Sequence, residues 1–600
     1  MSSSAVTQLP DRTVAAYASS LTEALEGTTW WVSNEGGVMS RDGHITGIRS
    51  DGDGYGDYLG ENVVITRLSS DQQSSFDRRV EMARQTNIAR YPIGVVVRHD
   101  HLGLVAMGID MTGERWAVMG FYLLTDFWVK WCDGIKYIMV KLEKISSPST
   151  SDWIPSDFDE LAACCATCKE PLVSRYQGCP PICGTPRCAT NATPSGDNSQ
   201  PTGDYNKEWL DTRHNLFIPP FSTSLLPNLP QFMNKQELVA LHNVCTSRIE
   251  RINWNGWFCV RCLRLNQRVY WNRLECRKCG NSVPYGMPDF GLEELVPPGW
   301  RDITIDSAIP GLKFNDHITH TVNDSHPGYV VHTFRLDDEN SVIIGFPTEL
   351  AVTYKEGSKS VFEKLWARVQ EGTIPLQRCP VRAKIPGQLT RFFATNYGEE
   401  YLAKMATDTT SFEEAPDVIR CIKNELTSVV WEILGGEDPK FNELLCIGNY
   451  PNMAMNWHKD GEKGVGPVVA SFSYGGTAIM SFAMDRRHLV GRGRKNGAYL
   501  YETILPGCLK EEKKRSLMKK RDEGRITNEK YREKFRDVVD KITMPSANKP
   551  ILQFPLPGTG TLMIQVGKSL NQRFEHKVEH NGIARLVTTC RTIEHDEHQA

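Results

Sequence analysis

Two Cys-x2-Cys pairs constrain the middle of this chain more strongly than any other feature. The stretch WFCVRCLRLNQRVYWNRLECRKCG carries Cys259 and Cys262, then thirteen residues, then Cys276 and Cys279. Each pair forms a knuckle that presents two thiolates to one ion, and two knuckles complete a closed tetrahedral zinc site. The spacing therefore predicts a structural zinc site of the zinc-ribbon type, with no open position for catalysis.

A second group of cysteines precedes this site in CCATCKEPLVSRYQGCPPICGTPRC. Eleven of the seventeen cysteines fall between Cys164 and Cys279, and such clustering in a long chain favours metal binding over disulfides. We expect a second structural zinc site here. By spacing, its possible ligands are Cys165, Cys168, Cys179 and Cys183. Because Cys164 and Cys188 are left over, the choice of four ligands stays open, as does a site shared between the two clusters.

Basic and aromatic residues lie between the two Cys-x2-Cys pairs. They are Arg261, Arg264, Arg268, Tyr270, Trp271 and Arg273. Interleaved cations and rings suit phosphate contact and base stacking on a nucleic acid. A solvated basic face of a zinc ribbon is the equally available alternative.

The length of 600 residues predicts several domains, at about 100–200 residues each. Strand-like runs broken by glycine and aspartate dominate, so we expect a multidomain α+β protein that is mostly β, with a β-barrel or sandwich near the N-terminus. The predicted regions are a tail at 1–27, a β-rich module at 28–150, a cysteine-rich region at 151–295 with a linker at 190–206, a β-rich region at 296–395, and a C-terminal unit at 396–600 that carries an insertion at 485–550. One amphipathic helix is predicted within Glu414–Gly435 from apolar residues at helical spacing.

The N-terminus shows no basic segment followed by an apolar core, and no apolar run reaches the ~18 residues that a membrane span requires. We therefore expect an intracellular protein with no membrane association, and we expect it in the nucleus.

A possible metal motif lies in NWHKDGEKGVGP, which contains His458 and Asp460. On a strand, residues two apart point to the same face. A non-haem Fe(II) oxygenase binds its metal with two histidines and one carboxylate and leaves the other positions open. The third ligand is expected from a later strand, and LNQRFEHKVEHNGIARLVTTCRTI offers His576 and His580.

The same downstream stretch contains Arg585 and Arg591, six residues apart. This even separation places both guanidinium groups on one face of a strand. Paired guanidinium groups can form bidentate contacts with a dicarboxylate such as 2-oxoglutarate. A metal triad followed by two arginines on one face is much more specific than either part alone.

With these motifs, residues from about 441 to 593 resemble the AlkB-like Fe(II)/2-oxoglutarate-dependent dioxygenases. The family pattern of His-x-Asp, a distal His and Arg-x5-Arg is matched by His458, Asp460, His576, Arg585 and Arg591. The distal spacing is similar to that of the fat-mass-and-obesity-type branch, and the DGEK turn resembles AlkB-like proteins of fungi. His576 fits the family spacing to the first arginine, and His580 is then expected in a loop or at the surface.

The resemblance implies a double-stranded β-helix (jelly roll) as the C-terminal catalytic domain. It implies Fe(II) at His458, Asp460 and His576, and 2-oxoglutarate and O2 as co-substrates. In FNELLCIGNYP, Asn449 and Tyr450 resemble family residues that contact 2-oxoglutarate, beside Arg585 and Arg591. The implied reaction is oxidative demethylation of N-methylated bases in DNA or RNA.

The insertion at 485–550 carries 19 Lys and Arg against 10 Asp and Glu, so its net charge is +9 in a chain of -3. It leaves the β-rich unit between the two parts of the metal motif, and positive charge there favours a polyanionic substrate. A solvated helical hairpin is the alternative. Two other functions stay open: a hydroxylase of a protein or small molecule, and a zinc-dependent nucleic-acid-binding protein with an inactive oxygenase domain.

Overall fold

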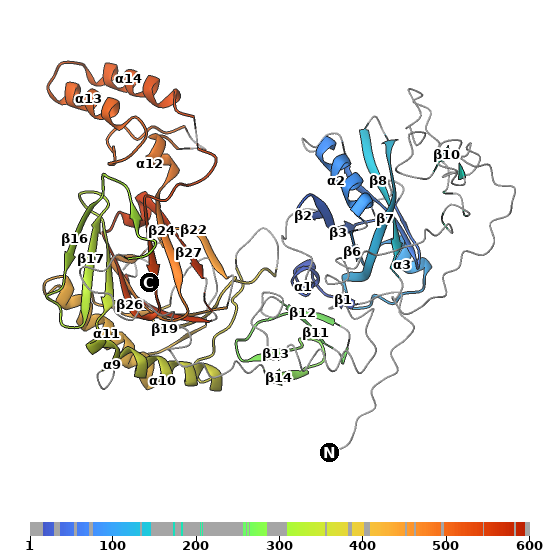
Figure 1. The fold of residues 1–600 in the computed structure, drawn as a ribbon, viewed down its shortest axis with the longest axis horizontal. Helices are drawn as coiled ribbons and strands as arrows, with labels where there is room; N and C mark the ends of the chain where they lie inside the picture. Colours follow the sequence, from blue (N-terminus) through green and yellow to red (C-terminus); the bar gives the residue numbers. More distant parts are fainter. Residues whose placement is uncertain are drawn as a thin grey trace, which may run out of the picture. The chain divides into compact units, whose positions relative to one another are not determined.

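The structure of the protein is a computed structural model. It describes residues 16–28, 37–52, 57–70, 76–89, 91–132, 135–145, 172–173, 182–183, 205, 207, 210, 256–259, 261–262, 264–284, 309–353, 357–381, 387–400, 408–450, 453–460, 464–493, 497–543, 545–580, 582 and 584–594. The described chain is mostly β and contains several sheets, as the sequence predicted (Figure 1). It divides into two compact units. Unit 1 comprises Met1–Cys245, Asn255–Gln267 and Glu275–Ser282, and unit 2 comprises Thr246–Trp254, Arg268–Leu274 and Val283–Ala600.

Unit 1 is built on one ten-stranded sheet. The main path runs β11-β12-β1-β7-β6-β3-β2, while β8 joins β7 to β5 and β5 pairs with β4. Its elements are β1 (Ala16–Ala18), α1 (Leu21–Glu26), β2 (Val38–Arg41), β3 (His44–Ser50), β4 (Tyr58–Leu59), β5 (Val63–Ser70), α2 (Phe76–Ala89), β6 (Ile93–Arg98), α3 (Leu102–Ala106), β7 (Trp116–Cys132), β8 (Ile135–Lys144), β11 (Gly256–Cys259) and β12 (Arg264–Gln267). Helix α2 packs against β3, β5 and β7. Its Asn87 side chain donates to the Leu124 carbonyl oxygen at 2.7 Å, which ties the helix to the sheet.

The larger sheet of unit 2 has nine strands in the order β16-β17-β18-β26-β23-β28-β21-β19-β20. Their bounds are β16 (Thr319–Asn323), β17 (Tyr329–Arg335), β18 (Ser341–Pro347), β19 (Phe393–Gly398), β20 (Thr409–Thr410), β21 (Glu443–Asn449), β23 (Val465–Gly475), β26 (Thr559–Val566) and β28 (Arg585–Ile593). Strands from the stretches predicted as 296–395 and 396–600 therefore lie in one sheet.

The smaller sheet has five strands in the order β15-β25-β24-β27-β22. They are β15 (Lys313–Phe314), β22 (Ala454–His458), β24 (Ala478–Met484), β25 (Leu552–Leu556) and β27 (Phe574–His580). An apolar core joins the two sheets, with Ile344 and Met563 from the larger sheet and Met480 and Phe554 from the smaller one. From β21 to β28 the chain alternates between the sheets, with β24 and β25 as one consecutive pair in the smaller sheet.

Helices α10 (Ser358–Glu371) and α11 (Asp417–Ile433) cover the larger sheet and contact β23 (Figure 1). In α11, Val418, Ile422 and Leu426 are buried at helical spacing, so the helix predicted within Glu414–Gly435 is confirmed. Because the helices lie on one face of the sheet, the other face is left for the core and the site.

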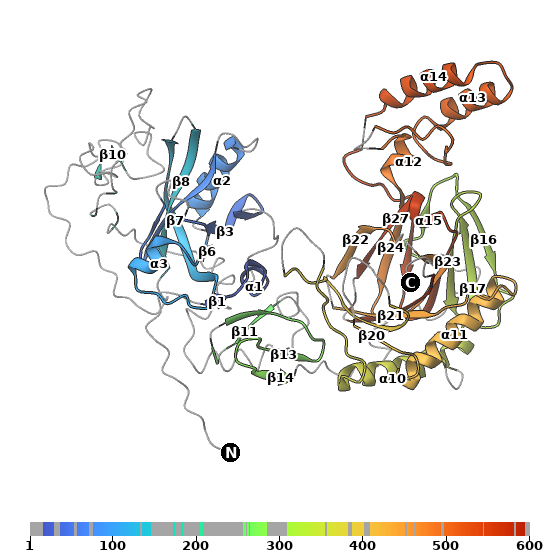
Figure 2. The same ribbon diagram turned by 180° about the vertical axis from the view of Figure 1, so that it is seen from behind.

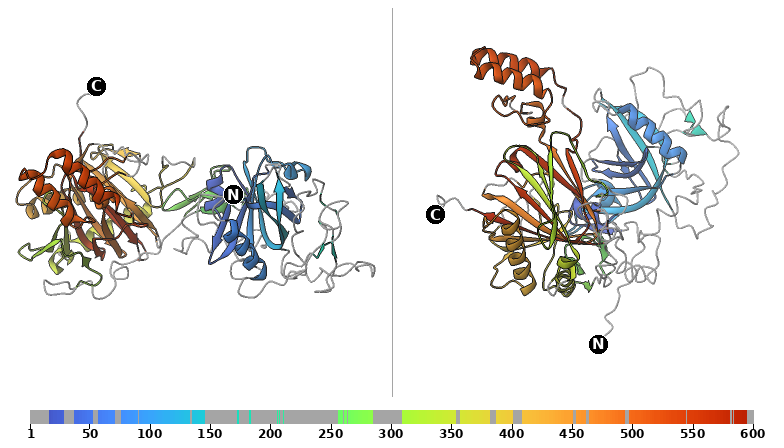
Figure 3. Two further views of the ribbon diagram at one scale, coloured as in Figure 1. Left: turned by 90° about the horizontal axis from the view of Figure 1, so that it is seen from above. Right: turned by 60° about the vertical axis from the view of Figure 1, so that its left-hand side comes forward.

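The insertion at 485–550 forms α12 (Arg486–Val490), α13 (Glu511–Asp522) and α14 (Asn528–Asp540). The α13–α14 hairpin stands away from the two sheets (Figure 2; Figure 3, right). Val490, Tyr531 and Phe535 give it a small core of its own.

The remaining short elements are α9 (Glu349–Thr353), α15 (Leu570–Arg573), and the strand pairs β9 (Leu172–Val173) with β10 (Ile182–Cys183) and β13 (Arg273–Glu275) with β14 (Ser282–Pro284). Among the described residues, no helix has the length and apolar character needed to cross a membrane.

Candidate active site

Three predicted metal ligands, His458, Asp460 and His576, lie together in unit 2. Neighbouring strands β22 and β27 place His458 directly opposite His576. Asp460 follows β22, and its carboxylate oxygens lie 3.7 Å from Nε2 of each histidine. One ligand atom from each of the three residues lies within 4.8 Å of the others, as binding of a single ion requires.

A register shift in β22 contributes to this geometry. Between Met455 and His458 the strand holds one more residue than β27 holds between Val578 and His576. Such a bulge turns a side chain away from the regular alternation. The His458 Nδ1 also hydrogen-bonds the Asn456 carbonyl oxygen at 2.7 Å, which orients the ring and leaves Nε2 for a metal.

The electrostatic environment keeps His576 and Asp460 in their metal-binding protonation states. Burial, reinforced by His458, lowers the pKa of His576 to about 3, so its imidazole is neutral at pH 7. Burial opposes ionisation of Asp460, but His576, Arg591 and His458 outweigh it and hold the pKa of Asp460 below its ordinary value. A neutral imidazole and an ionised carboxylate are the forms that bind metal.

The triad opens into a cavity of about 390 Å³ between the two sheets. Alternate residues of β28 line it, namely Arg585, Val587, Thr589 and Arg591. Leu445, Ile447 and Asn449 of β21 line it with the same period. The even spacing that the sequence showed between the two arginines therefore brings both to the cavity, because side chains of a strand alternate between its faces.

Arg585 lies buried in this cavity, where its Nη2 donates to Ser473 Oγ at 2.7 Å. Its Nε has no hydrogen-bond partner among the described residues. Burial lowers the pKa of Arg585 to about 9, so the group is still charged at pH 7. A buried guanidinium with an unused donor is suited to an anionic ligand.

Arg591 is buried near the triad and faces Glu443, whose Oε1 lies 3.8 Å from its Nη1. Burial raises the pKa of Glu443 to about 7. The sequence reasoning missed Glu443, although a lone carboxylate in the otherwise apolar strand ELLCIGN was a usable signal.

Two predicted residues take other positions. Tyr450 is buried outside the cavity, and its hydroxyl contacts Arg268 Nη2 at 2.7 Å and donates to the Trp271 carbonyl oxygen at 3.2 Å. The strand places Asn449 and Tyr450 on opposite faces, so only Asn449 reaches the cavity. The expectation that His580 lies in a loop or at the surface is wrong, because His580 is buried at the end of β27, with Nδ1 3.1 Å from the Thr477 carbonyl oxygen.

Sequence reasoning did not identify several other residues that line the cavity. They are Gln388, Arg391, Phe392, Met455 and Asn456. The first three lie in a connection before β19 that matches no motif, so only the tertiary arrangement identifies them.

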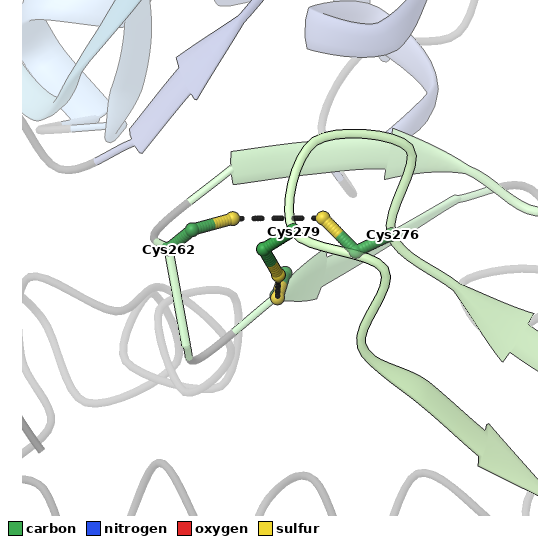
Figure 4. A group of neighbouring side chains, drawn as sticks. Cys262, Cys276 and Cys279 are labelled. Carbon is green, nitrogen blue, oxygen red and sulfur yellow. Dashed lines mark hydrogen bonds between the residues drawn. The ribbon is translucent and has the colours of Figure 1, made fainter. Parts of the chain in front are cut away.

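The four ligands predicted for the zinc ribbon also lie together, in unit 1 (Figure 4). The Sγ atoms of Cys259 and Cys279 are 3.6 Å apart, and those of Cys262 and Cys276 are 3.5 Å apart. Tetrahedral zinc with bonds of about 2.3 Å requires about 3.8 Å between sulfurs, so the cluster fits zinc.

The predicted second zinc site falls outside the described residues. Cys165, Cys168 and Cys179 are not described, and of Cys183 only the backbone in β10 is described.

The aromatic and basic residues between the zinc knuckles are only partly exposed. Arg261 is exposed, but Arg264 is buried and pairs with Glu23 at 3.1 Å. The side chains of Arg268 and Trp271 are 0% and 1% exposed. Stacking of a nucleic-acid base on Trp271 is therefore ruled out in this conformation.

Fold and site together define a class: unit 2 has two facing β-sheets and a candidate metal site of two histidines and one carboxylate beside two buried arginines. Comparison with known proteins does not identify this chain with any particular protein. No family model matches the chain, and no curated protein matches it.

Three solved structures give distant likenesses. The SUVH5 SRA complex with methylated CHH DNA is 18% identical over 24% of this chain and 94% of that chain, with a TM-score of 0.17. The SUVH5 SRA complex with fully methylated CG DNA is 20% identical over 19% and 76%, with a TM-score of 0.15. The structure of OsALKBH1 is 12% identical over 45% and 100%, with a TM-score of 0.21. Similarities this low carry no argument about this chain, so function is argued from its own residues.

Proposed function

We propose that the protein is an Fe(II)/2-oxoglutarate-dependent dioxygenase. The observation that carries the proposal is the His458, Asp460 and His576 cluster, which shares one cavity with the buried Arg585. Two imidazoles and one carboxylate with open positions are the donor set of non-haem Fe(II) oxygenases. The alternation of β21 to β28 between two sheets supports a jelly roll as the fold of this catalytic unit.

Each cavity residue then has a defined task. His458, Asp460 and His576 hold Fe(II), and Arg585 binds the distal carboxylate of 2-oxoglutarate through its free Nε and a hydroxyl-anchored Nη2. Arg591 faces Glu443, and its charge keeps the nearby Asp460 carboxylate ionised for the metal. When bound, iron, 2-oxoglutarate and O2 supply the oxidant that hydroxylates an unactivated C–H bond. Apolar residues of the cavity wall, such as Leu445 and Ile447, exclude water from the cavity.

For the substrate, we favour N-methylated bases in DNA or RNA. Hydroxylation of an N-methyl group yields a hemiaminal that loses formaldehyde. The first turn of the basic insertion is anchored at the cavity, because Lys459, which lines it, pairs with Asp485 at the start of α12. A cationic insertion at this position supports a polyanionic substrate.

The exposed cations of the hairpin add to this support. Lys513 and Lys520 of α13 and Lys534 of α14 are exposed and form no ion pair with a carboxylate in the described part of the chain. They are free to contact phosphates, whereas Lys519 and Lys530 pair with Glu523 and Glu533.

The test is turnover of 2-oxoglutarate to succinate by the full chain, followed by mass spectrometry of a panel of methylated nucleosides in DNA and RNA. His458→Ala and Asp460→Ala should abolish turnover, while His580→Gln, on the same strand as His576 but outside the cavity, should retain it. Full turnover by the two alanine variants would refute the metal assignment.

The substrate proposal has its own outcomes. Formaldehyde release from methylated oligonucleotides, but not from methylated peptides, is the expected result. If succinate forms only with peptide or small-molecule substrates, the nucleic-acid proposal is refuted and the substrate belongs to that other class. Salt-sensitive oligonucleotide binding without any turnover would indicate a binding protein with an inactive oxygenase unit.

A further inference from the structure

The segment between the two zinc knuckles, Arg268–Leu274, is part of unit 2, and we call it the interknuckle segment. Backbone hydrogen bonds tie it to the residues that precede β19. Trp271 N donates to the Leu376 carbonyl oxygen at 3.0 Å, and Arg378 N donates to the Val269 carbonyl oxygen at 2.7 Å. Tyr270 bridges to Gln377, which in turn bridges to Ala394 of β19. The segment is therefore hydrogen-bonded to the edge of the larger sheet.

The side chains of the interknuckle segment enclose Tyr450. The rings of Trp271 and Tyr450 are stacked, with centroids 4.1 Å apart and planes 11° apart. The Arg268 guanidinium lies 4.7 Å from the Tyr450 ring and 5.3 Å from the Phe393 ring. Its Nη2 reaches the Tyr450 hydroxyl at 2.7 Å. Stacking, a cation–π contact and hydrogen bonds thus fix this one tyrosine.

Gly448 gives independent support for the closeness of this contact. A Cβ at Gly448 would lie 2.8 Å from Trp271 Cζ3 and 2.8 Å from Leu376 Cδ1. Since real Cβ atoms do not approach carbon so closely, β21 can meet the Trp271 ring here only with glycine. Strand β21 and the interknuckle segment therefore pack in direct contact at Gly448 and Trp271.

The neighbour of Tyr450 in the chain belongs to the cavity. Asn449 lines the cavity and is paired in register with Arg585 across β21 and β28. Tyr450 directly follows β21, so whatever fixes Tyr450 also fixes the end of the strand at Asn449, directly beside the arginine that holds the co-substrate in the proposed function. Two metal ligands, His458 and His576, lie on β22 and β27 of the smaller sheet, and Asp460 follows β22.

The two ends of the interknuckle segment are covalently close to the cysteines. Cys262 precedes Arg268 by six residues, and Cys276 follows Leu274 by two. A zinc ion that links the two Cys-x2-Cys pairs closes this loop and reduces the conformational freedom of the segment.

We propose that the interknuckle segment is a positioning element for the co-substrate end of the cavity, and that zinc at the four cysteines holds it, so that zinc loss weakens 2-oxoglutarate binding. This inference rests on the proposed dioxygenase function. It gives Tyr450 an indirect role, on the side of β21 away from the cavity, in place of direct contact with 2-oxoglutarate.

The first test replaces the stacked ring in the full chain. Binding of 2-oxoglutarate is measured by calorimetry with Mn(II) in place of Fe(II), so that no turnover occurs. Trp271→Ala should raise the Kd for 2-oxoglutarate about 10- to 100-fold, the range expected for the loss of one hydrogen bond to a charged group. Affinity for Mn(II) should be unchanged. The matched control is Trp431→Ala, whose ring on α11 is 49% exposed, and its Kd should equal that of the unmodified protein.

Milder variants cover the case in which Trp271→Ala does not fold. Trp271→Phe keeps part of the stack, and Tyr450→Phe removes only the hydroxyl contacts. Each should raise the Kd about three- to tenfold, the value of one or two hydrogen bonds or a weakened ring contact. Steady-state kinetics should show a higher KM for 2-oxoglutarate at nearly unchanged kcat. An unchanged Kd in both variants would overturn the proposal.

The zinc arm uses Cys276→Ser, with metal content measured by mass spectrometry. The expected result is loss of zinc together with a Kd raised to the range of Trp271→Ala. Zinc loss with an unchanged Kd would refute the coupling. Failure of the unmodified protein to bind 2-oxoglutarate would instead refute the proposed function, and with it this inference.

Discussion

Replacement of Arg585 by methionine should make the ligand-free protein more stable and at the same time weaken 2-oxoglutarate binding strongly. The side chain is buried, only one of its donors is shown to be satisfied by Ser473, and its Nε lacks a partner among the described residues. The charge is therefore maintained at a cost to folding. Methionine has a similar reach and no polar hydrogen to leave unpaired.

The magnitude follows from the pKa. Burial lowers the pKa of Arg585 from 12.5 to about 9, and at about 1.4 kcal/mol for each pH unit the charged form carries a penalty of about 5 kcal/mol. Apolar replacement of buried ionic groups is typically neutral or stabilising by about 1–4 kcal/mol. In a unit of this size, each kcal/mol raises the melting temperature by about 2–4 °C. Loss of the charged contact should weaken 2-oxoglutarate binding by about 2–5 kcal/mol, a factor of roughly 30 or more.

Scanning calorimetry with and without 2-oxoglutarate measures both effects. At a ligand concentration of 100 Kd the unmodified protein should gain about 2.7 kcal/mol of stability, and Arg585→Met, with its Kd raised roughly 30-fold or more, should gain less than about 1 kcal/mol at that concentration. Ser473→Ala is the control: it removes one hydrogen bond, should destabilise by about 1 kcal/mol, and should keep the ligand response. A destabilised Arg585→Met would show that the buried charge costs no folding free energy. An Arg585→Met that 2-oxoglutarate stabilises as much as the unmodified protein would show that the guanidinium does not bind the ligand.

Three further predictions concern other parts of the molecule. Burial lowers the pKa of His580 to about 3 and that of His332 to about 4, so below pH 6.5 the unfolded chain binds protons that the folded chain does not. The unfolding free energy should therefore fall from pH 6.5 toward pH 4 by up to about 1.4 kcal/mol per pH unit for each histidine. His332→Gln should weaken this pH dependence of the unfolding free energy, measured by urea titrations across the range. Cys259→Ser should lower the zinc content by one ion per chain, whereas Cys379→Ser, at a buried cysteine outside the cluster, should not; equal zinc in both variants would exclude the predicted ligand set. Replacing Lys513 and Lys534 by glutamine should reduce the slope of log K against log salt for oligonucleotide binding by about 1.4–1.8, while replacing Lys519 and Lys530, which pair with glutamates, should reduce it less; equal slopes would remove the hairpin from the interface.

Spacing along the sequence determined the local geometry of this protein. The period of a strand placed Arg585 and Arg591 on one face, and the structure shows both in the cavity. The period of a helix gave the buried stripe of α11. The Cys-x2-Cys spacing gave the four-cysteine cluster, because each pair needs only a short turn to bring its thiolates together. These features depend on residues close in the chain, so they could be predicted without the fold.

The tertiary structure decided what depends on pairing between distant strands. His576 and His580 lie on the same face of β27, so periodicity does not distinguish them, and the register with β22 places only His576 opposite His458. Likewise, Glu443 becomes the partner of Arg591 only because β21 and β28 are paired in that register. Trp271, which reads from the sequence as an available stacking surface, is buried against Tyr450, some 180 residues further along the chain. Contacts across such separations are set by which strands become neighbours, and no local pattern of residues encodes that choice.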